Sequence, residues 1–296
     1  MRRIFTVGMS LLLASCAASI TQPTDEPVVI QGSDTEVQLV SNLAEAFQAA
    51  NADADLSVTG GGSAVGIAAL INSEADLANS SRQMKPEELQ QAKDKGLNVV
   101  EFILARDGLS VIVHPENPIT ALTMDQVKGL YDGSIANWKE VGGADAEVVL
   151  YGRQSTSGTF SFFRDIVVKA DYAQTMRQLE GTQAIVEAVK ADKNGIGYAG
   201  VGYVKDKQSE VNVLPISSGG EPVSSLDKEA VLAGRYPIAR AIYQYLPNPP
   251  AKDSTLEKFL RFEASPEGLA IIEATGFYPT SAEDQATNAA FFETIR

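Results

Sequence analysis

The sequence predicts an α/β fold, and three observations support this prediction. Short apolar runs typical of strands alternate along the chain with longer amphipathic stretches typical of helices. Hydrophobic side chains make up 44% of the 296 residues, enough for the core of one large domain or two smaller ones. No internal repeat of fixed period is present. We therefore expect parallel sheets flanked by helices.

The first part of the chain alternates strands with helices. Apolar residues recur at helical spacing from Val37 to Phe47, which gives the first helix one buried face. Pro86 suits the first turn of the third helix. The predicted elements are, in order, a strand at 28–30, a helix at 35–50, a strand at 56–58, a helix at 64–72, a strand and loop at 76–82, a helix at 86–95 and a strand at 99–104.

Two strongly β-forming runs lie at 109–113 and 235–246, and the same alternation continues between them. Between these runs we expect helices at 124–131, 160–168 and 184–190, and strands at 148–151 and 196–199. Helices at 254–262 and 266–274 follow, and the end of the chain is polar.

The first 27 residues have the pattern of a targeting segment. Arg2 and Arg3 precede an apolar run over residues 4–13 that is too short to span a membrane. The next residues, ending in Cys16, resemble the bacterial lipobox, in which the cysteine is lipidated. The alternative is an ordinary signal peptide with an incidental cysteine. We expect a signal peptide at 1–15, a lipid anchor and polar tether at 16–27, and a folded part outside the cytoplasm that meets the membrane through the anchor only.

Composition excludes several function classes. The net charge of −14 disfavours nucleic-acid binding, which needs a basic surface. The chain has one cysteine and one histidine, His114, which are too few for the usual zinc sites and disfavour Cys/His and Ser/His/Asp catalytic sets. No Walker-type Gly-Lys-Ser/Thr follows a glycine loop. We therefore expect no metal, no cofactor and no covalent catalysis.

Three segments rich in small and hydroxyl residues each precede a predicted helix, at residues 32–35, 60–63 and 153–159. A helix start presents unpaired backbone N–H groups and the positive end of the helix dipole, so it attracts anions. Three such starts, one of them preceded by an arginine, predict a site that holds a small oxyanion from several sides. If the two parts of the chain form two lobes, this site lies between them.

Asp34 is unexpected beside an anion. A carboxylate there could accept a proton from monohydrogen phosphate and reject sulfate, which carries none. The alternative is that Asp34 only caps its helix. The guanidinium of Arg153 has paired N–H donors that suit two parallel hydrogen bonds to an oxyanion. The alternative is that Arg153 lies on the surface, as most arginines do. Ser63 either caps its helix or reaches the ligand, and Arg82 is either a second cationic contact or a brace for Asp34.

These residues belong to a set of motifs that resembles a known family. The set comprises residues 32–35, 61–63, 80–82, 133–138, 153 with 157–159, 194–198 and 236–240. In order and spacing it is similar to the phosphate-binding proteins of bacterial high-affinity phosphate ABC transporters, from about residue 28 to the C-terminal helices. Within this set, residues 137–138 and 195–198 are interpreted as lobe structure and not as ligand contacts.

The resemblance implies a two-lobed periplasmic-binding-protein fold of type II, in which each lobe is a sheet flanked by helices and two hinge strands cross between the lobes. Lobe I would comprise residues 28–106 and 240–296, and lobe II residues 107–239. The implied protein is a monomeric receptor that binds inorganic phosphate and delivers it to ABC permease subunits. Phosphate contacts are expected from Ser33, Asp34, Thr35, Ser63, Ser81, Arg82, Arg153, Ser157, Gly158 and Thr159.

Some family members carry the proton-accepting aspartate where this chain has Ser81, and a threonine where it has Asp34. We therefore predict that Asp34 has taken over that role. A receptor for sulfate, molybdate or tungstate is the alternative within the class, and an extracellular phosphatase or an adhesin-like module that has lost the ligand is the alternative outside it.

Overall fold

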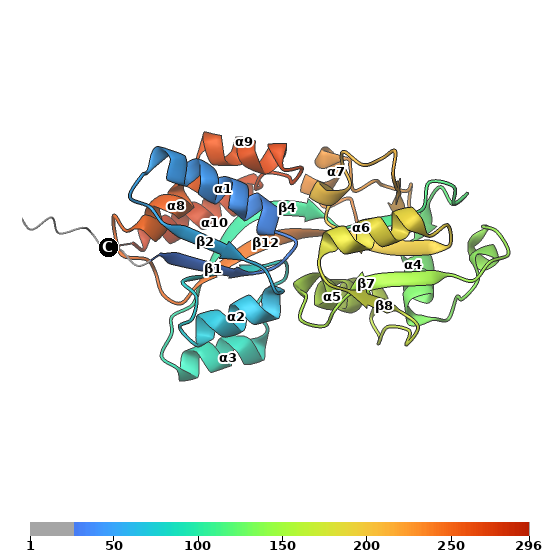
Figure 1. Ribbon diagram of the computed structural model, residues 1–296, viewed down its shortest axis with the longest axis horizontal. Coiled ribbons are helices and arrows are strands. Elements are labelled where there is room, and N and C mark those ends of the chain that lie inside the picture. Colours follow the sequence, from blue (N-terminus) through green and yellow to red (C-terminus); the bar gives the residue numbers. More distant parts are fainter. Residues whose placement is uncertain (1–26, 296) are drawn as a thin grey trace, which may run out of the picture.

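The computed structural model describes residues 27–295, which form two lobes side by side, each built on a five-stranded sheet with flanking helices (Figure 1). Residues 1–15, the predicted signal peptide, and Cys16 lie outside the described residues, as does all of the tether but residue 27.

The first lobe takes its elements from both ends of the chain. Its strands lie in the order β2-β1-β3-β12-β4. Its elements are β1 (Val28–Gly32), α1 (Val37–Ala50), β2 (Leu56–Thr59), α2 (Ser63–Ile71), β3 (Leu77–Ser80), α3 (Pro86–Asp94), β4 (Val100–Gly108), β12 (Ala239–Leu246), α8 (Thr255–Glu263), α9 (Pro266–Ala274) and α10 (Ala282–Glu293).

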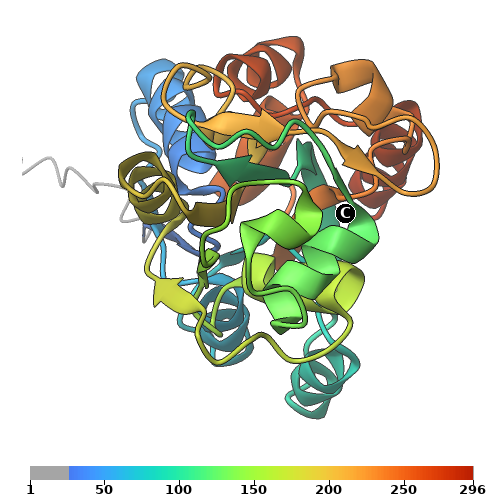
Figure 2. The ribbon, with the colours of Figure 1, turned by 90° about the vertical axis from the view of Figure 1, so that its right-hand side faces the viewer.

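The second lobe is formed by the middle of the chain, with strands in the order β10-β5-β9-β7-β8 and a separate pair of β11 and β6. Figure 2 turns this lobe toward the viewer, with the green helix α4 in front. Its elements are β5 (Ser110–Val113), β6 (Leu122–Thr123), α4 (Met124–Asp132), η1 (Trp138–Val141), β7 (Val149–Arg153), α5 (Gly158–Phe163), η2 (Arg164–Val168), β8 (Arg177–Leu179), α6 (Thr182–Ala191), β9 (Gly195–Ala199), η3 (Val201–Tyr203), β10 (Asn212–Leu214), β11 (Ile216–Ser217) and α7 (Lys228–Leu232).

Both sheets are mixed, so the expectation of purely parallel sheets is wrong. In the first lobe β1 runs parallel to β2 and β3, while β12 runs antiparallel to β3 and β4. In the second lobe β7 runs parallel to β8 and β9, while β5 is antiparallel to β9 and β10. The antiparallel strands adjoin the connections between the lobes, where the chain leaves the first sheet through β4 and returns to it through β12.

The paired strands β4 and β12 form the link between the lobes. Their register runs from Ala239 opposite Gly108 to Leu246 opposite Val100, with an irregularity between Ile242 and Tyr243. After Gly108 only Leu109 separates β4 from β5 of the second sheet. Two extended strands therefore cross between the lobes, which is the hinge arrangement that the resemblance implies.

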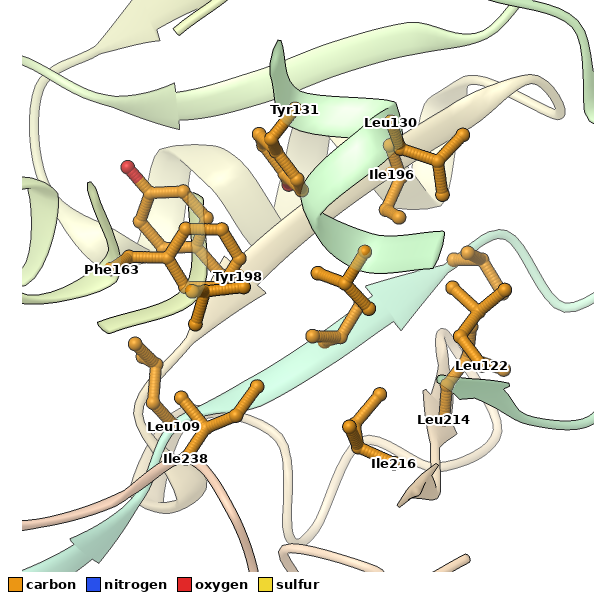
Figure 3. Packing of buried hydrophobic residues seen from close by; sticks show 14 of the residues in the cluster. Leu109, Leu122, Leu130, Tyr131, Phe163, Ile196, Tyr198, Leu214, Ile216 and Ile238 are labelled. Atoms are coloured by element: carbon orange, nitrogen blue, oxygen red, sulfur yellow. The ribbon is translucent and has the colours of Figure 1, made fainter. Parts of the chain in front are cut away.

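Each lobe has its own hydrophobic core. In the second lobe the Phe163 ring stacks on Tyr198 with centroids 4.3 Å apart and meets the edge of Tyr131 at 4.9 Å (Figure 3). In the first lobe Phe47 packs edge-on against Phe259, with centroids 5.4 Å apart. Aromatic pairs of this kind add to the free energy of burial and make each lobe a rigid support for its loops.

Helix α10 is absent from the elements predicted for the polar chain end. Two of its three buried residues are polar, and only near its end do Phe291 and Phe292 pack against Phe102, so hydrophobic periodicity misses it. The Asn288 side-chain amide donates to the Ile103 carbonyl at 2.8 Å and accepts from the Ile103 N–H at 3.0 Å, and Asp284 forms an ion pair with Arg106. Because β4 is the edge strand of its sheet, these bonds satisfy backbone groups that the sheet leaves open.

Candidate anion-binding site

The first ligand loop leaves β1 at Gly32, whose φ of +146° disfavours other residues. A Cβ on Gly32 would lie 2.1 Å from the Asn79 carbonyl oxygen, so the backbone can make this approach only with glycine. Ser33 donates its N–H to that carbonyl at 3.0 Å, and its own carbonyl accepts from Glu36 N–H at 3.0 Å. The loop is thereby tied to β3 before α1 begins.

The second loop ends in Gly62, which has a φ of +98° and is the N-cap of α2. Ser63 is the first residue of that helix, and its hydroxyl does not cap it. Instead Ser63 Oγ accepts the backbone N–H of Ser81 at 3.1 Å. This bond turns the Ser63 hydroxyl toward the loop that follows β3, where the other hydroxyl groups gather.

The third loop runs from the end of β7 to the start of α5 in the other lobe. Ser157 caps α5, since its hydroxyl accepts the Phe160 N–H at 3.4 Å, and Gly158 is the first helical residue. Figure 1 shows α2 and α5 on the facing sides of the two lobes. The contact between them is direct, because Ala64 N–H donates to the Thr156 carbonyl at 3.1 Å.

The loops bring hydroxyl groups from both lobes into one cluster. Thr159 Oγ1 of the second lobe lies 2.8 Å from Thr35 Oγ1 and 3.2 Å from Ser81 Oγ, both in the first lobe. Ser81 Oγ in turn lies 3.4 Å from Ser63 Oγ. All four side chains are buried. A Cβ on Gly158 would lie 2.2 Å from Ser63 Oγ, so the lobes can approach this closely only with glycine there.

Asp34 and Arg153 join the lobes beside the hydroxyl cluster. Asp34 Oδ2 forms an ion pair with Arg153 Nη2, and Asp34 Oδ1 accepts the Gly61 N–H at 2.9 Å. Asp34 therefore does not cap α1, whose N-cap is Glu36. Arg153 is 1% exposed. Its Nη1 donates to Thr182 Oγ1 at 3.1 Å, whereas its Nε has no hydrogen-bond partner among residues 27–295.

Arg82 lies apart from this group. Its guanidinium donates two hydrogen bonds to the Glu88 carboxylate at 2.7 and 2.8 Å. The interpretation of Arg82 as a brace for Asp34 is therefore wrong, since Arg153 occupies that position. The capping box of α3 explains the difference, because Glu88 also accepts the Lys85 N–H at 2.8 Å and so lies within reach of Arg82.

The remaining predicted residues surround the cluster. Ser33 is 2% exposed and lies on the first ligand loop. None of the hydroxyl contacts within the cluster involves Ser33 or Ser157. The structure thus joins Thr35, Ser63, Ser81 and Thr159 directly, with Gly158 packed against them.

Several supporting residues were missed by the sequence interpretation. Tyr203 Oη donates to the Asp34 carbonyl at 2.7 Å, and burial raises the pKa of Tyr203 to about 12. Tyr198 Oη accepts the Arg153 backbone N–H at 3.0 Å. Arg240 donates to the Ser81 carbonyl at 3.0 Å while paired with the buried Asp107. Tyr198 and Arg240 fall in quoted motifs, whereas no sequence signal marked Tyr203.

A cavity of about 560 Å³ opens beside the Asp34–Arg153 pair. Asp34 and Thr182, the two side-chain partners of Arg153, both line it, together with Tyr203. The hydroxyl cluster does not line the cavity. An anion that enters from the cavity would therefore meet Asp34 and Thr182 before it meets the cluster.

Within the part of the chain that the structure describes, no group of three or more His, Cys, Asp or Glu side chains could hold a metal ion. In that same part, no helix has the length and apolar character needed to cross a bilayer.

Comparisons with known proteins identify the family of the chain. Residues 17–267 match the PBP superfamily domain. The chain belongs to the PBP superfamily. It is 31% identical over 268 residues to the phosphate-binding protein PstS of Pseudomonas aeruginosa, covering 85% of this chain and 82% of that protein. It is 28% identical over 277 residues to PstS of Staphylococcus epidermidis, covering 90% and 85%.

Among superfamily members of known structure, a phosphate ABC transporter substrate-binding protein with bound phosphate from Clostridium perfringens superposes with a TM-score of 0.76. It is 29% identical in sequence, and the match covers 86% of this chain and 100% of that one. The two-lobed fold is thus shared over nearly the whole of the described chain.

Proposed function

We propose that the chain is a receptor that binds inorganic phosphate between its two lobes. The observation that carries the proposal is the cluster of hydroxyls from Thr35, Ser63, Ser81 and Thr159, contributed by both lobes. The ion pair between Asp34, which precedes Thr35, and Arg153 joins the same two lobes. The phosphate-binding names of the relatives support the same ligand.

The contacts within the cluster give a mechanism for binding. The hydroxyls now bond to one another, and an entering anion replaces those bonds with charge-assisted ones of roughly 1.5–3 kcal/mol each. Three or four such bonds, after the cost of ordering, reach about −8 kcal/mol, which is a micromolar dissociation constant. Since the contacts come from both lobes, the anion stabilises the closed arrangement.

Phosphate rather than sulfate is proposed because of Asp34. Its carboxylate lines the cavity, one residue before Thr35 of the cluster, and its Oδ2 is directed to Arg153 of the second lobe, where we expect it to accept the proton of monohydrogen phosphate. Sulfate offers no proton, so its oxygens would face an unsatisfied charge.

Calorimetric titration of the purified protein with phosphate, arsenate, sulfate and molybdate tests this function. We expect phosphate to bind at micromolar concentration or below and sulfate at least tenfold more weakly. Absence of phosphate binding refutes the proposal. A chromogenic phosphate ester serves as the test of the rival hydrolase, and we expect no hydrolysis.

Delivery and location complete the proposal. We infer that the receptor acts outside the cytoplasm as a monomer, is held to the membrane by lipid on Cys16, and passes phosphate to ABC permease subunits. The lipobox resemblance and the transporter named for the Clostridium perfringens protein support these steps. In Cys16→Ser the protein should leave the membrane fraction while keeping its phosphate affinity. Retention of the variant in the membrane fraction would refute the lipid anchor.

A further inference from the structure

Glu36, the N-cap residue of α1, is a buried acid that directly follows the first ligand loop. None of the proposed phosphate contacts involves it. Its side chain is 0% exposed, and neither carboxyl oxygen has a hydrogen-bond partner among the described residues. An ionised carboxylate in such a place is costly, so the neutral acid is favoured unless the surroundings supply compensating charge.

The charged groups around Glu36 do not supply that compensation. Arg240 on β12 is the nearby cation, but its guanidinium is paired with Asp107 of β4 at 2.8 Å and bonded to the Ser81 carbonyl. Asp107 and Glu263 of α8 are further acids that face Glu36, and Tyr203 of the second lobe lies near enough to be affected by it. Burial raises the pKa of Glu36 well above its ordinary value, against the weaker opposing effects of Ser33 and Arg240.

Ser33 connects this acid to the ligand loop. The Ser33 carbonyl accepts the Glu36 N–H at 3.0 Å, which closes a turn that holds the two residues together. The Ser33 side chain opposes the effect of burial on the pKa of Glu36. A hydroxyl has one proton to donate. An ionised Glu36 accepts a hydrogen bond from the Ser33 hydroxyl, so Ser33 presents only lone pairs to an anion. A neutral Glu36 donates a hydrogen bond to Ser33 Oγ, which leaves the Ser33 hydroxyl free to donate to the anion.

We propose that Glu36 is a positioning residue that couples phosphate binding to proton uptake, its neutral carboxyl donating to Ser33 so that Ser33 donates to phosphate. The inference rests on the proposed function and adds a form of regulation to that site. Where Glu36 is ionised in the free protein, the proton comes from solvent as phosphate binds. Affinity therefore falls as pH rises through the pKa that Glu36 has in the free protein.

The test is calorimetric titration with inorganic phosphate from about pH 6 to pH 9, on the wild type and Glu36→Gln, in buffers of different ionisation enthalpy. Gln is neutral, similar in size and able to donate to Ser33. Phosphate's own ionisation is the same in both titrations and cancels. We expect the wild-type dissociation constant to rise relative to that of Glu36→Gln by up to about tenfold per pH unit, with up to one extra proton taken up.

Glu263→Gln is the matched control, because Glu263 is also fully buried but bonds to Gln244 and not to the ligand loop. It should keep a pH dependence of the same slope, although the loss of a neighbouring acid lowers the pH at which this dependence sets in. Parallel pH profiles in the wild type and Glu36→Gln would overturn the proposal, and so would a linkage lost in Glu263→Gln but kept in Glu36→Gln. If Glu36→Gln does not fold, Ser33→Ala replaces it: this variant should lose the extra pH dependence, and a wild-type profile in it overturns the proposal. Absence of phosphate binding by the wild type at every pH would instead refute the proposed function.

Discussion

Replacement of Asp34 by asparagine tests how the site distinguishes phosphate from sulfate. Asparagine has the size of aspartate and keeps an oxygen that can accept the Gly61 N–H, now made at 2.9 Å by Asp34 Oδ1. It removes the charge that pairs with Arg153 and the second oxygen that could accept a proton from the ligand. The loop should therefore keep its shape while its acceptor is lost.

The expected magnitude follows from the bonds affected. Phosphate loses one charge-assisted hydrogen bond of roughly 1.5–3 kcal/mol, which weakens binding by about 10- to 150-fold. Sulfate loses a repulsive contact instead and should bind more tightly. Release of Arg153 from Asp34 favours both anions alike, so it cancels in the ratio of the two dissociation constants. We expect the preference for phosphate to fall at least tenfold.

Competition calorimetry of the two anions measures this ratio. Asp145→Asn is the control, since it changes the net charge by the same amount at a side chain that is 71% exposed. Among residues 27–295, Asp145 is paired only with Lys139 and Asn137. It should leave the preference unchanged. An unaltered preference in Asp34→Asn would assign the proton acceptor to another group.

Other predictions concern the lobe contacts and stability. Arg153→Ala should weaken phosphate binding at least tenfold in calorimetry, whereas Arg82→Ala, which loses an ion pair within one lobe, should lower the melting temperature and spare the affinity; equal affinities in the two variants would remove Arg153 from the site. Gly158→Ala should also weaken phosphate binding tenfold or more, because the new methyl would lie 2.2 Å from the Ser63 hydroxyl. Gly220 has open space around it, so Gly220→Ala should bind phosphate with wild-type affinity. Wild-type affinity in both variants would mean that the lobes need not close this far. Burial raises the pKa of Glu263 to about 8, so its contribution to stability is complete below its unfolded value of about 4.3 and is lost as pH rises toward 8. Urea unfolding should show wild-type stability falling over that interval relative to Glu263→Gln, and parallel curves would contradict it.

Local patterns predicted most of the fold. Strand β1 and helices α1, α2 and α3 lie within two residues of their expected bounds, because hydrophobic periodicity, glycine and proline act over a few residues. The direction of β12 and the presence of α10 depend on contacts between distant segments, which periodicity does not record. The expected lobe boundaries at 106/107 and 239/240 fall close to the ends of β4 and β12 and stay predictions.

Sequence patterns predicted the site to about the same extent as the fold. Glycine loops at helix starts identified the segments that meet, yet they did not show which side chains bond to which. Arg82 follows β3 and Arg153 ends β7, each next to hydroxyl-rich residues, and their partners Glu88 and Asp34 separate their roles. The link between Tyr203 and Asp34 joins residues 169 positions apart and had no local signature.

The charge balance of the site explains how so acidic a chain could hold an anion. The full chain has a net charge of −14, and Arg153 is paired with Asp34, so the site has little net positive charge. Attraction must come from dipoles that the two lobes align: hydroxyls and the N–H groups at the starts of α2 and α5. The field of a dipole falls off more steeply with distance than that of a charge, so we expect tight binding to need closure of the lobes. We predict that selectivity then depends on Asp34, since the hydroxyl and N–H groups can donate to any tetrahedral oxyanion.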